Sequence, residues 1–252
     1  MTELKALIFD VDGTLAETER DGHRIAFNRA FAEAELDWDW SVELYGKLIE
    51  ISGGKERIRH YINSYQPNFP LTNNLDQFIV NLHKAKTRHY EQLAAAGLIP
   101  LRPGVKRLLK AAQGEGLRLA IATTSALPNV LALLKHTLGE DSPSWFEVIA
   151  AGDMVAAKKP APDIYSYVLK EMNLKPENCL VFEDSYAGLQ AACQAGLKSI
   201  ITINNYTKNS DFSQAMLVLN HLGEPNNPFT VLAGNVEKRD YLDLPLLYSL
   251  SR

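Results

Sequence analysis

The sequence is poor in cysteine, in long apolar runs and in excess charge of either sign, and each scarcity excludes a class of protein. Only two cysteines, Cys179 and Cys193, occur among 252 residues, which provides no disulfide framework and fits a reducing compartment. No apolar run approaches the ~20 residues that a membrane-spanning helix needs. The net charge of −4 argues against a general binder of nucleic acid or membrane surfaces. We therefore expect a globular protein with neither nucleic acid nor membrane as a partner.

The sequence also predicts no leader segment. The first expected strand begins within about five residues of Met1, which leaves no room for a signal or transit peptide. The expected location is therefore the cytoplasm. Hydrophobic residues make up 46% of the chain and charged residues 22%, as is typical of globular proteins. A chain of this length holds one large domain or a domain carrying an inserted smaller one, and we expect it to act as a monomer.

The order of helical and strand patterns divides the chain into two parts. Between residues 16 and 95 every pattern is helical, with apolar residues recurring at a helical period. From residue 96 onward, apolar strand-like runs alternate with amphipathic helices, which favours a parallel sheet covered on both faces. The predicted fold is α/β: a Rossmann-like, doubly wound parallel sheet formed by residues 1–15 and 96–252. An all-helical domain, residues 16–95, is expected to be inserted after the first strand.

The tail of the chain carries a weaker pattern and no evident chemistry. Its apolar residues predict an amphipathic helix over Asp211–Leu222 and an edge strand over Phe229–Leu232. Asn226-Asn227-Pro228 predicts a turn between them. Residues 238–252 are expected to be irregular.

The first strand leads directly into two carboxylates. Leu7-Ile8-Phe9 is followed by Asp10 and Asp12, one residue apart, and then by Gly13. A loop beyond the strand can bring both acids toward one point, where they repel unless a cation lies between them or they divide acid and base roles. Asp and Gly are also ordinary turn formers, so this stretch alone leaves both explanations open.

Polar groups follow three later strands as well. Thr123 and Thr124 end the expected second strand, Lys159 lies in the loop after the third, and Glu183 and Asp184 end the fourth. In an open parallel sheet, ligands bind beyond the carboxyl ends of the strands. Carboxylates there suit a hard cation such as Mg²⁺, while hydroxyl groups and a lysine suit phosphoryl oxygens.

Each group also has an ordinary structural explanation. The threonines could cap a helix, the lysine could lie in a solvated loop, and the acidic pair could favour a helix N-terminus. Their joint occurrence at one end of one sheet favours phosphate chemistry.

In this order, the groups resemble the four motifs of the haloacid dehalogenase (HAD) superfamily, whose opening motif is D-x-D-G-T. Residues 159–165 and 183–188 resemble the third and fourth motifs of its β-phosphoglucomutase-like branch, which carries a helical cap after the first motif. The resemblance covers nearly the whole chain and implies the HAD fold, with residues 16–95 as the cap domain.

The same resemblance implies a mechanism with Mg²⁺ as cofactor. Asp10 would attack phosphorus and form a phosphoaspartate, and Asp12 would act as general acid and then general base. Thr123 and Lys159 would hold phosphoryl oxygens. The implied metal ligands are Asp10, the backbone carbonyl of Asp12 and Asp184, with Glu183 as a ligand or a partner of coordinated water.

Within that branch, the stretch Ser52–Ile58 and the tail segments Ile203–Thr207 and Asn220–Pro225 resemble the CbbY proteins, which are sugar bisphosphate phosphatases. The resemblance implies a phosphorylated sugar as substrate: xylulose 1,5-bisphosphate, an inhibitor of Rubisco in the Calvin cycle, would be hydrolysed to xylulose 5-phosphate. The implied substrate-binding residues are Glu17, His23, Gly53, Gly54, Lys55, Arg57 and Thr124, with Lys55 and Arg57 on the distal phosphate.

Structural alternatives to these assignments stay open. Gly53-Gly54 could end one helix, Lys55 and Arg57 could form an exposed face of the next, and His23 could be a packed helical histidine.

Two other functions also stay open. A mutase would use the same aspartates but return the phosphate to the sugar, and it would require glucose 1,6-bisphosphate without net phosphate release. The spacing from Thr18 to His23, one residue longer than in β-phosphoglucomutase, weakens this alternative. A non-catalytic binding protein on the same scaffold is disfavoured because Asp10, Asp12, Lys159 and Asp184 are all present.

Overall fold

The computed structural model describes residues 3–51, 53–67, 69–70, 74–152, 154–236 and 238–251. The chain forms two compact units, one of Met1–Glu17 with Pro100–Arg252 and the other of Thr18–Ile99. The predicted insertion, residues 16–95, starts and ends slightly earlier than this second unit. Within the described residues, no helix is long and apolar enough to cross a bilayer.

The first unit is built on a seven-stranded sheet, as the described residues define it, in the order β3-β2-β1-β4-β5-β6-β7. All neighbours pair in parallel except β6 and β7, which are antiparallel. The strands are β1 (Ala6–Phe9), β2 (Arg118–Thr123), β3 (Val148–Ala151), β4 (Cys179–Glu183), β5 (Lys198–Thr202), β6 (Leu217–Leu219) and β7 (Val231–Ala233). The predicted Rossmann-like parallel sheet is confirmed.

Strand β1 lies at the middle of the sheet and sets the register that the site depends on. Phe9, its last residue, pairs with Ile121 of β2 on one side and with Phe182 of β4 on the other. All four residues of β1 are fully buried, as expected for a parallel strand covered on both faces. The residues that follow β1, β2 and β4 therefore emerge at the same edge of the sheet.

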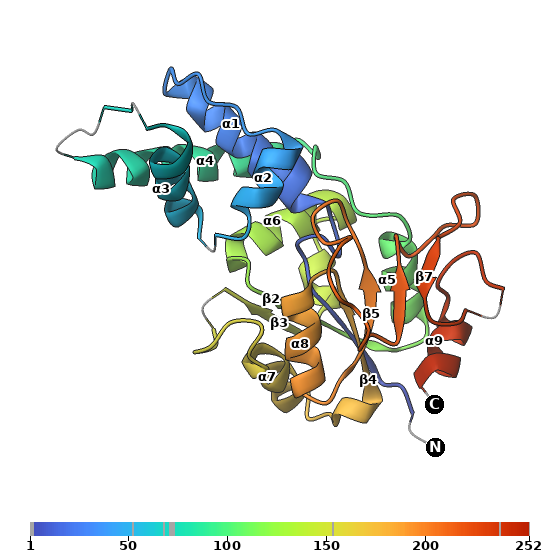
Figure 1. The fold of residues 1–252 in the computed structure, drawn as a ribbon. Coiled ribbons are helices and arrows are strands. Elements are labelled where there is room, and N and C mark those ends of the chain that lie inside the picture. The colour runs from blue at the N-terminus through green and yellow to red at the C-terminus, as the bar shows by residue number, and fades with distance from the viewer. Residues whose placement is uncertain are drawn as a thin grey trace. The chain divides into compact units, whose positions relative to one another are not determined.

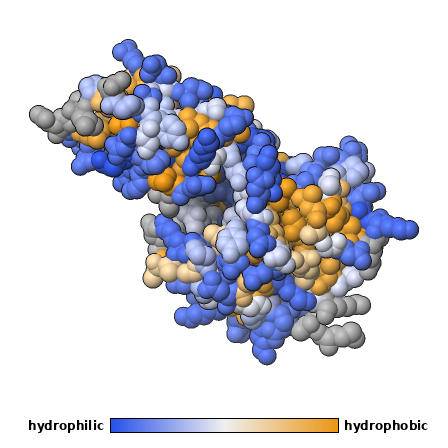
Figure 2. Space-filling view, in the orientation of Figure 1, coloured by the Kyte–Doolittle hydropathy of each residue, from blue (hydrophilic) through white to orange (hydrophobic). Residues whose placement is uncertain are grey.

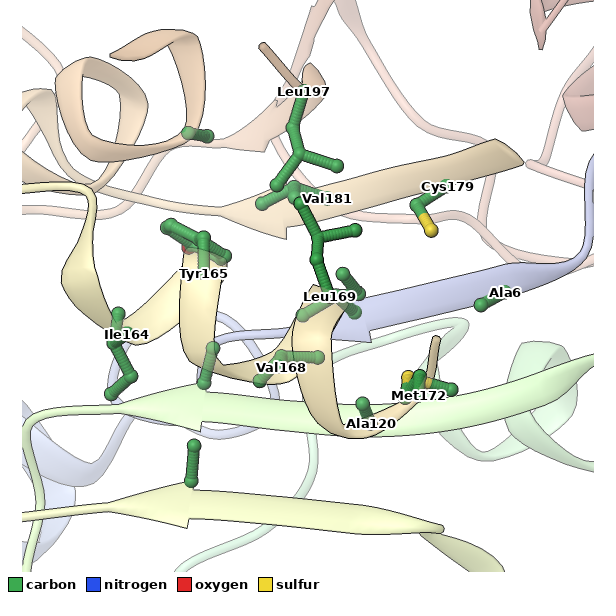
Figure 3. Close-up of a cluster of buried hydrophobic side chains, with 14 of the residues drawn as sticks. Ala6, Ala120, Ile164, Tyr165, Val168, Leu169, Met172, Cys179, Val181 and Leu197 are labelled. Carbon is green, nitrogen blue, oxygen red and sulfur yellow. The ribbon is translucent and has the colours of Figure 1, made fainter. Parts of the chain in front are cut away.

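One face of the sheet is covered by α7 (Asp163–Glu171) and α8 (Tyr186–Gln194). Figure 3 shows α7 packed over the sheet, with Ile164, Tyr165 and Val168 in the buried cluster between them. They pack with Ala6 and Ile8 of β1 and with residues of β2 and β4 in one buried cluster. Alternation along β1 turns Leu7 and Phe9 to the opposite face. The remaining helices of this unit are α5 (Val105–Gly114), α6 (Leu127–Leu138), α9 (Leu244–Ser251) and the short 3₁₀ turns η2 (Ser142–Trp145) and η3 (Pro176–Asn178).

The tail differs from the sequence-based expectation in two places. The helix predicted over residues 211–222 is wrong, because Leu217–Leu219 instead forms β6 and pairs with β5. Its apolar residues gain burial by extending the sheet, which outweighs a local helical period. The predicted irregular terminus is also wrong, since Leu244–Ser251 forms α9. The Asp243 carboxylate accepts a hydrogen bond from the Leu246 N–H at its start (2.9 Å), a capping signal.

The predicted edge strand is present as β7, at the end of the sheet. Its side chains are exposed: Val231 and Leu232 are 36% and 50% accessible. In the space-filling view, hydrophobic side chains gather on the surface of the first unit in this area (Figure 2).

In its described residues, the second unit is all-helical, as predicted. It contains η1 (Thr18–His23), α1 (Arg24–Glu33), α2 (Val42–Leu48), α3 (Gly54–Tyr65) and α4 (Leu75–Ala95). Ser41 caps α2 by accepting a hydrogen bond from the Leu44 N–H (3.1 Å). Its core is aromatic: Trp40 is fully buried and packs against Phe27 and Phe31 at ring-centre distances of 4.6 and 4.8 Å. These contacts provide large buried apolar area within a small unit.

Candidate active site

Three neighbouring strands deliver the polar residues of the site. Asp10 directly follows β1, and its N–H continues the sheet pairing by donating to the Phe182 carbonyl (3.0 Å). Thr123 is the last residue of β2 and Glu183 the last residue of β4. Asp10, Thr123 and Glu183 are all buried. Side chains that lie far apart in the sequence are thus brought to one edge by strand register alone.

Lys159, from the segment between β3 and α7, reaches the two carboxylates that flank it. Its ammonium group donates to Asp10 Oδ1 (2.7 Å), Glu183 Oε1 (2.5 Å) and the Ala122 carbonyl (2.9 Å). The lysine side chain is only 7% exposed. A buried ammonium needs such partners because it is costly to remove from water. The three acceptors equal its three N–H donors and hold the positive charge against Asp10.

Glu183 is an anchor for this lysine. The carboxylate is fully buried, and its Oε1 also accepts a hydrogen bond from the Tyr165 hydroxyl (2.6 Å). Its Oε2 accepts from the Asp184 N–H and the Ser185 hydroxyl, both at 3.2 Å. A Cβ atom at Gly188 would lie about 2 Å from the carboxylate atoms, so only glycine allows α8 to approach so closely. Both oxygens of Glu183 are therefore engaged by protein donors.

Tyr165 keeps its hydroxyl proton in this environment. Burial and the neighbouring Glu183 and Asp10 carboxylates raise the pKa of Tyr165 well above its ordinary value. The phenol is consequently a hydrogen-bond donor to Glu183 at all physiological pH values. Tyr165 lies in the first turn of α7. The sequence places it at the end of the stretch that resembles the third motif but assigns it no role.

Asp10, Glu183 and Asp184 each offer a carboxylate oxygen, and these atoms lie within 4.8 Å of one another. Burial raises the pKa of Asp10 to about 7, with Glu183 and Asp12 adding to the increase and Lys159 opposing it. Burial and the neighbouring carboxylates also raise the pKa of Asp184 well above its ordinary value. Lys159 and Arg102 oppose these increases without cancelling them, and a hard divalent cation with oxygen ligands would favour the ionised carboxylates further. The donor set fits such a metal.

Asp12 has a hydrogen-bond partner of its own. Its carboxylate accepts a hydrogen bond from the Ser125 hydroxyl, and Asp12 is half-buried. Ser125 also donates its N–H to the Thr123 hydroxyl (3.2 Å), which links the end of β2 to Asp12. The two aspartates of the first motif therefore have different surroundings, as expected if they have different roles.

Thr123, Thr124 and Glu17, three further candidates of this unit, differ in burial and in their partners. Thr123 is fully buried, whereas Thr124 is exposed. Glu17 lies 3.3 Å from Arg102, measured between Glu17 Oε1 and Arg102 Nε. Arg102 was not singled out from the sequence. The role of Thr123 in holding phosphoryl oxygens and those of Thr124 and Glu17 in binding substrate stay predictions.

In the second unit, His23 is a packed side chain with a specific partner. It is buried, stacks on Tyr90 with ring centres 4.2 Å apart, and its Nδ1 accepts a hydrogen bond from Lys86 Nζ (2.9 Å). Burial and the nearby Lys86 and Arg57 hold the pKa of His23 well below its ordinary value. The imidazole is therefore neutral and carries its proton on Nε2. Its predicted contact with substrate is untested.

Arg57 and Lys55 differ in burial, although they are only two residues apart. Arg57 is buried and donates to the Tyr45 hydroxyl (2.8 Å) and to the Leu48 (3.1 Å) and Ile51 (3.3 Å) carbonyls. These bonds tie the first turn of α3 to α2 and the residues after it. Lys55 is exposed.

The glycines before these residues begin α3. Gly54 is its first residue, and Gly53 has φ 93°, a region that favours glycine. Ser52, quoted above with this stretch, lies outside the described residues.

Comparisons with known proteins agree with this geometry. The model of haloacid dehalogenase-like hydrolases matches residues 4–196. The CbbY protein of Rhodobacter capsulatus is 51% identical over 84% of this chain and 91% of its own length. The plasmid CbbY protein of Cupriavidus necator is 46% identical over 89% of this chain and 88% of its own length. The crystal structure of a D10N mutant of Rhodobacter sphaeroides CbbY in complex with xylulose 1,5-bisphosphate has a TM-score of 0.74 and 45% identity. It covers 86% of this chain and 94% of that one.

Proposed function

Because the chain belongs to the haloacid dehalogenase-like hydrolase family, and within it to the CbbY group, we propose that it is a Mg²⁺-dependent sugar bisphosphate phosphatase. The proposed reaction removes the 1-phosphate of xylulose 1,5-bisphosphate and releases xylulose 5-phosphate. The observation that carries this proposal is the arrangement of Asp10 beside Lys159 and two further buried carboxylates, with Asp12 held separately by Ser125. The complex of the related CbbY mutant with xylulose 1,5-bisphosphate supports the choice of substrate.

In the first step, Asp10 acts as the nucleophile. A carboxylate oxygen of Asp10 forms a bond to phosphorus while the bond from phosphorus to the sugar oxygen breaks. Asp12 gives its proton to that leaving oxygen, so the sugar departs as a neutral alcohol. Lys159 neutralises charge next to Asp10 as the phosphoryl group is transferred. The product on the protein is a phosphoaspartate.

In the second step, water releases the phosphate and restores Asp10. The Asp12 carboxylate takes a proton from the attacking water, whose oxygen bonds to phosphorus as the bond to Asp10 breaks. Mg²⁺, when bound, would supply positive charge near the transferring group, held by Asp10, the backbone carbonyl of Asp12 and Asp184. Glu183 serves mainly to hold Lys159, since both of its oxygens already accept hydrogen bonds.

The proposed substrate contacts include Lys55 and Arg57 on the distal phosphate. Lys55 is exposed and makes the simpler test of this role. Arg57 uses three of its N–H groups within its own unit, and a guanidinium has five. Glu17, His23, Gly53, Gly54 and Thr124 complete the proposed set.

The test is phosphate release with Mg²⁺ from xylulose 1,5-bisphosphate, measured beside ribulose 1,5-bisphosphate and β-glucose 1-phosphate. We expect a strong preference for the xylulose compound, and none of this activity in the Asp10→Asn variant. Comparable weak release from all three substrates would overturn the substrate assignment while leaving the aspartate chemistry intact. Conversion of β-glucose 1-phosphate that needs glucose 1,6-bisphosphate and releases no net phosphate would identify a mutase instead.

A further inference from the structure

The segment after β5 contains Asn204, whose side-chain oxygen and nitrogen both form hydrogen bonds. Asn204 Oδ1 accepts hydrogen bonds from the N–H groups of Tyr206 (2.8 Å) and Thr207 (3.2 Å). The Asn204 N–H in turn donates to the Thr207 hydroxyl (3.1 Å). These bonds form a local turn of the kind that Asn side chains favour. Because the oxygen of the amide faces its own loop, the Nδ2 group must point away from it.

That Nδ2 group donates to Asp184 Oδ2 at 2.6 Å. Asp184 is one of the three acids that could hold a metal ion. Gly13, in the loop after β1, lies against the same two groups: a Cβ atom there would be 2.1 Å from Asp184 Oδ2 and 2.6 Å from Asn204 Nδ2. One oxygen of Asp184 is therefore enclosed by the amide and the glycine, and these contacts restrict the rotation of the whole carboxylate.

Arg102 anchors the loops that carry these groups. Its guanidinium donates to the carbonyl of Gly13 and to those of Thr202 (3.1 Å), Ile203 (2.5 Å) and Asn220 (2.6 Å). Arg102 is 6% exposed, so these bonds are shielded from water and strengthened by the low local dielectric. Arg102 thus holds both Ile203, the residue before Asn204, and Gly13, which lies against the Asn204 side chain.

We propose that Asn204 is a positioning residue, which fixes the Asp184 carboxylate in the orientation needed to bind the metal ion. A carboxylate without this bond can rotate, and a metal must then order it on binding. Groups that orient a metal ligand typically contribute about 10- to 100-fold to metal affinity. The inference rests on the metal dependence in the proposed function.

The test is calorimetric titration of the metal-free protein with MgCl₂ in the absence of substrate. The variant is Asn204→Ser, because a serine hydroxyl can accept the turn hydrogen bonds but is too short to reach Asp184. The matched control is Asn205→Ser, the same exchange at the exposed neighbouring residue. A second control is Thr207→Val, which removes the hydroxyl that accepts from the Asn204 N–H and leaves the amide contact with Asp184 in place.

We expect Asn204→Ser to raise the Mg²⁺ dissociation constant about 10-fold or more, while both controls stay within about twofold of the wild type. Urea unfolding of the metal-free proteins shows whether each variant is folded. Mg²⁺ binding by Asn204→Ser as tight as in the wild type would overturn the inference. An equal loss in Thr207→Val would also overturn it, because loop stability would then be the cause. A wild-type chain that binds no Mg²⁺ would refute both the inference and the proposed cofactor.

Discussion

The substitution Asp10→Asn separates the chemical role of this residue from its effect on stability. Asp10 is 6% exposed, and burial raises its pKa from the ordinary 3.8 to about 7 even with Lys159 beside it. At about 1.4 kcal/mol for each tenfold change in proton affinity, the folded protein at pH 8 carries a penalty of up to about 4 kcal/mol for the ionised group. An amide carries no charge, and the variant avoids this penalty.

We therefore expect metal-free Asp10→Asn to be more stable than the wild type at pH 8, by about 1 to 4 kcal/mol. The lower bound reflects the weaker hydrogen bond from Lys159 to a neutral amide. Because the folded pKa lies above the unfolded one, the carboxyl group destabilises the wild type progressively as the pH rises from about 4 to about 7. The advantage of the variant should grow over the same interval and stay constant above it.

Urea unfolding in EDTA at pH 4.5, 6 and 8 measures this difference. Asp141→Asn serves as the control, because Asp141 is exposed and its exchange should change the unfolding free energy by less than about 0.5 kcal/mol. A variant that is no more stable than the wild type at pH 8, or an advantage independent of pH, would refute the argument that Asp10 is a strained, buried charge. Phosphate release by the variant should be lost, and retained release would refute the covalent route.

Four further substitutions test the groups around the site and the second unit. Tyr165→Phe removes the hydroxyl that donates to buried Glu183 and should cost about 1 to 3 kcal/mol in unfolding free energy; no loss would show that Glu183 is satisfied without it. Gly188→Ala places a methyl group about 2 Å from the Glu183 carboxylate, so we expect destabilisation by about 1 to 3 kcal/mol and reduced phosphate release. Arg57→Ala should lower the thermal midpoint because three hydrogen bonds are lost, whereas Lys55→Ala should leave the midpoint unchanged and raise KM for the bisphosphate. Equal effects of Arg57→Ala and Lys55→Ala on the thermal midpoint would contradict the argument from the different burial of the two side chains.

Residues at the ends of strands could be identified from the sequence because two rules place them. Apolar runs identify the buried parallel strands, and the carboxyl ends of such strands share one edge of the sheet. Asp10, Glu183 and Asp184 were singled out in this way, and their carboxylates lie together. The tail was predicted less well. Strand β6 has only three residues, and its pairing with β5 depends on residues distant in the sequence, which the local periodicity of apolar residues does not reveal.

Other contacts of these residues cannot be predicted from the sequence. Tyr165 ends the stretch that resembles the third motif, but only the structure shows that its hydroxyl donates to Glu183. Arg102 resembles any linker arginine until four carbonyls from three segments surround it. His23 and Lys86 are 63 positions apart. Hydrogen bonds between such residues depend on angles and on loop paths, which the order of residue types does not specify.

The sequence by itself determined the class of the fold, the helical insertion and the edge of the sheet at which the chemistry lies, because these follow from periodicity and strand ends. Only the tertiary structure decided how each polar group is used. In the structure, Glu183 accepts a hydrogen bond from Lys159, Ser125 donates to Asp12, and Asn204 donates to Asp184. The physical reason is that a buried polar atom must find its partner in space, and the partner is selected by packing of the whole core.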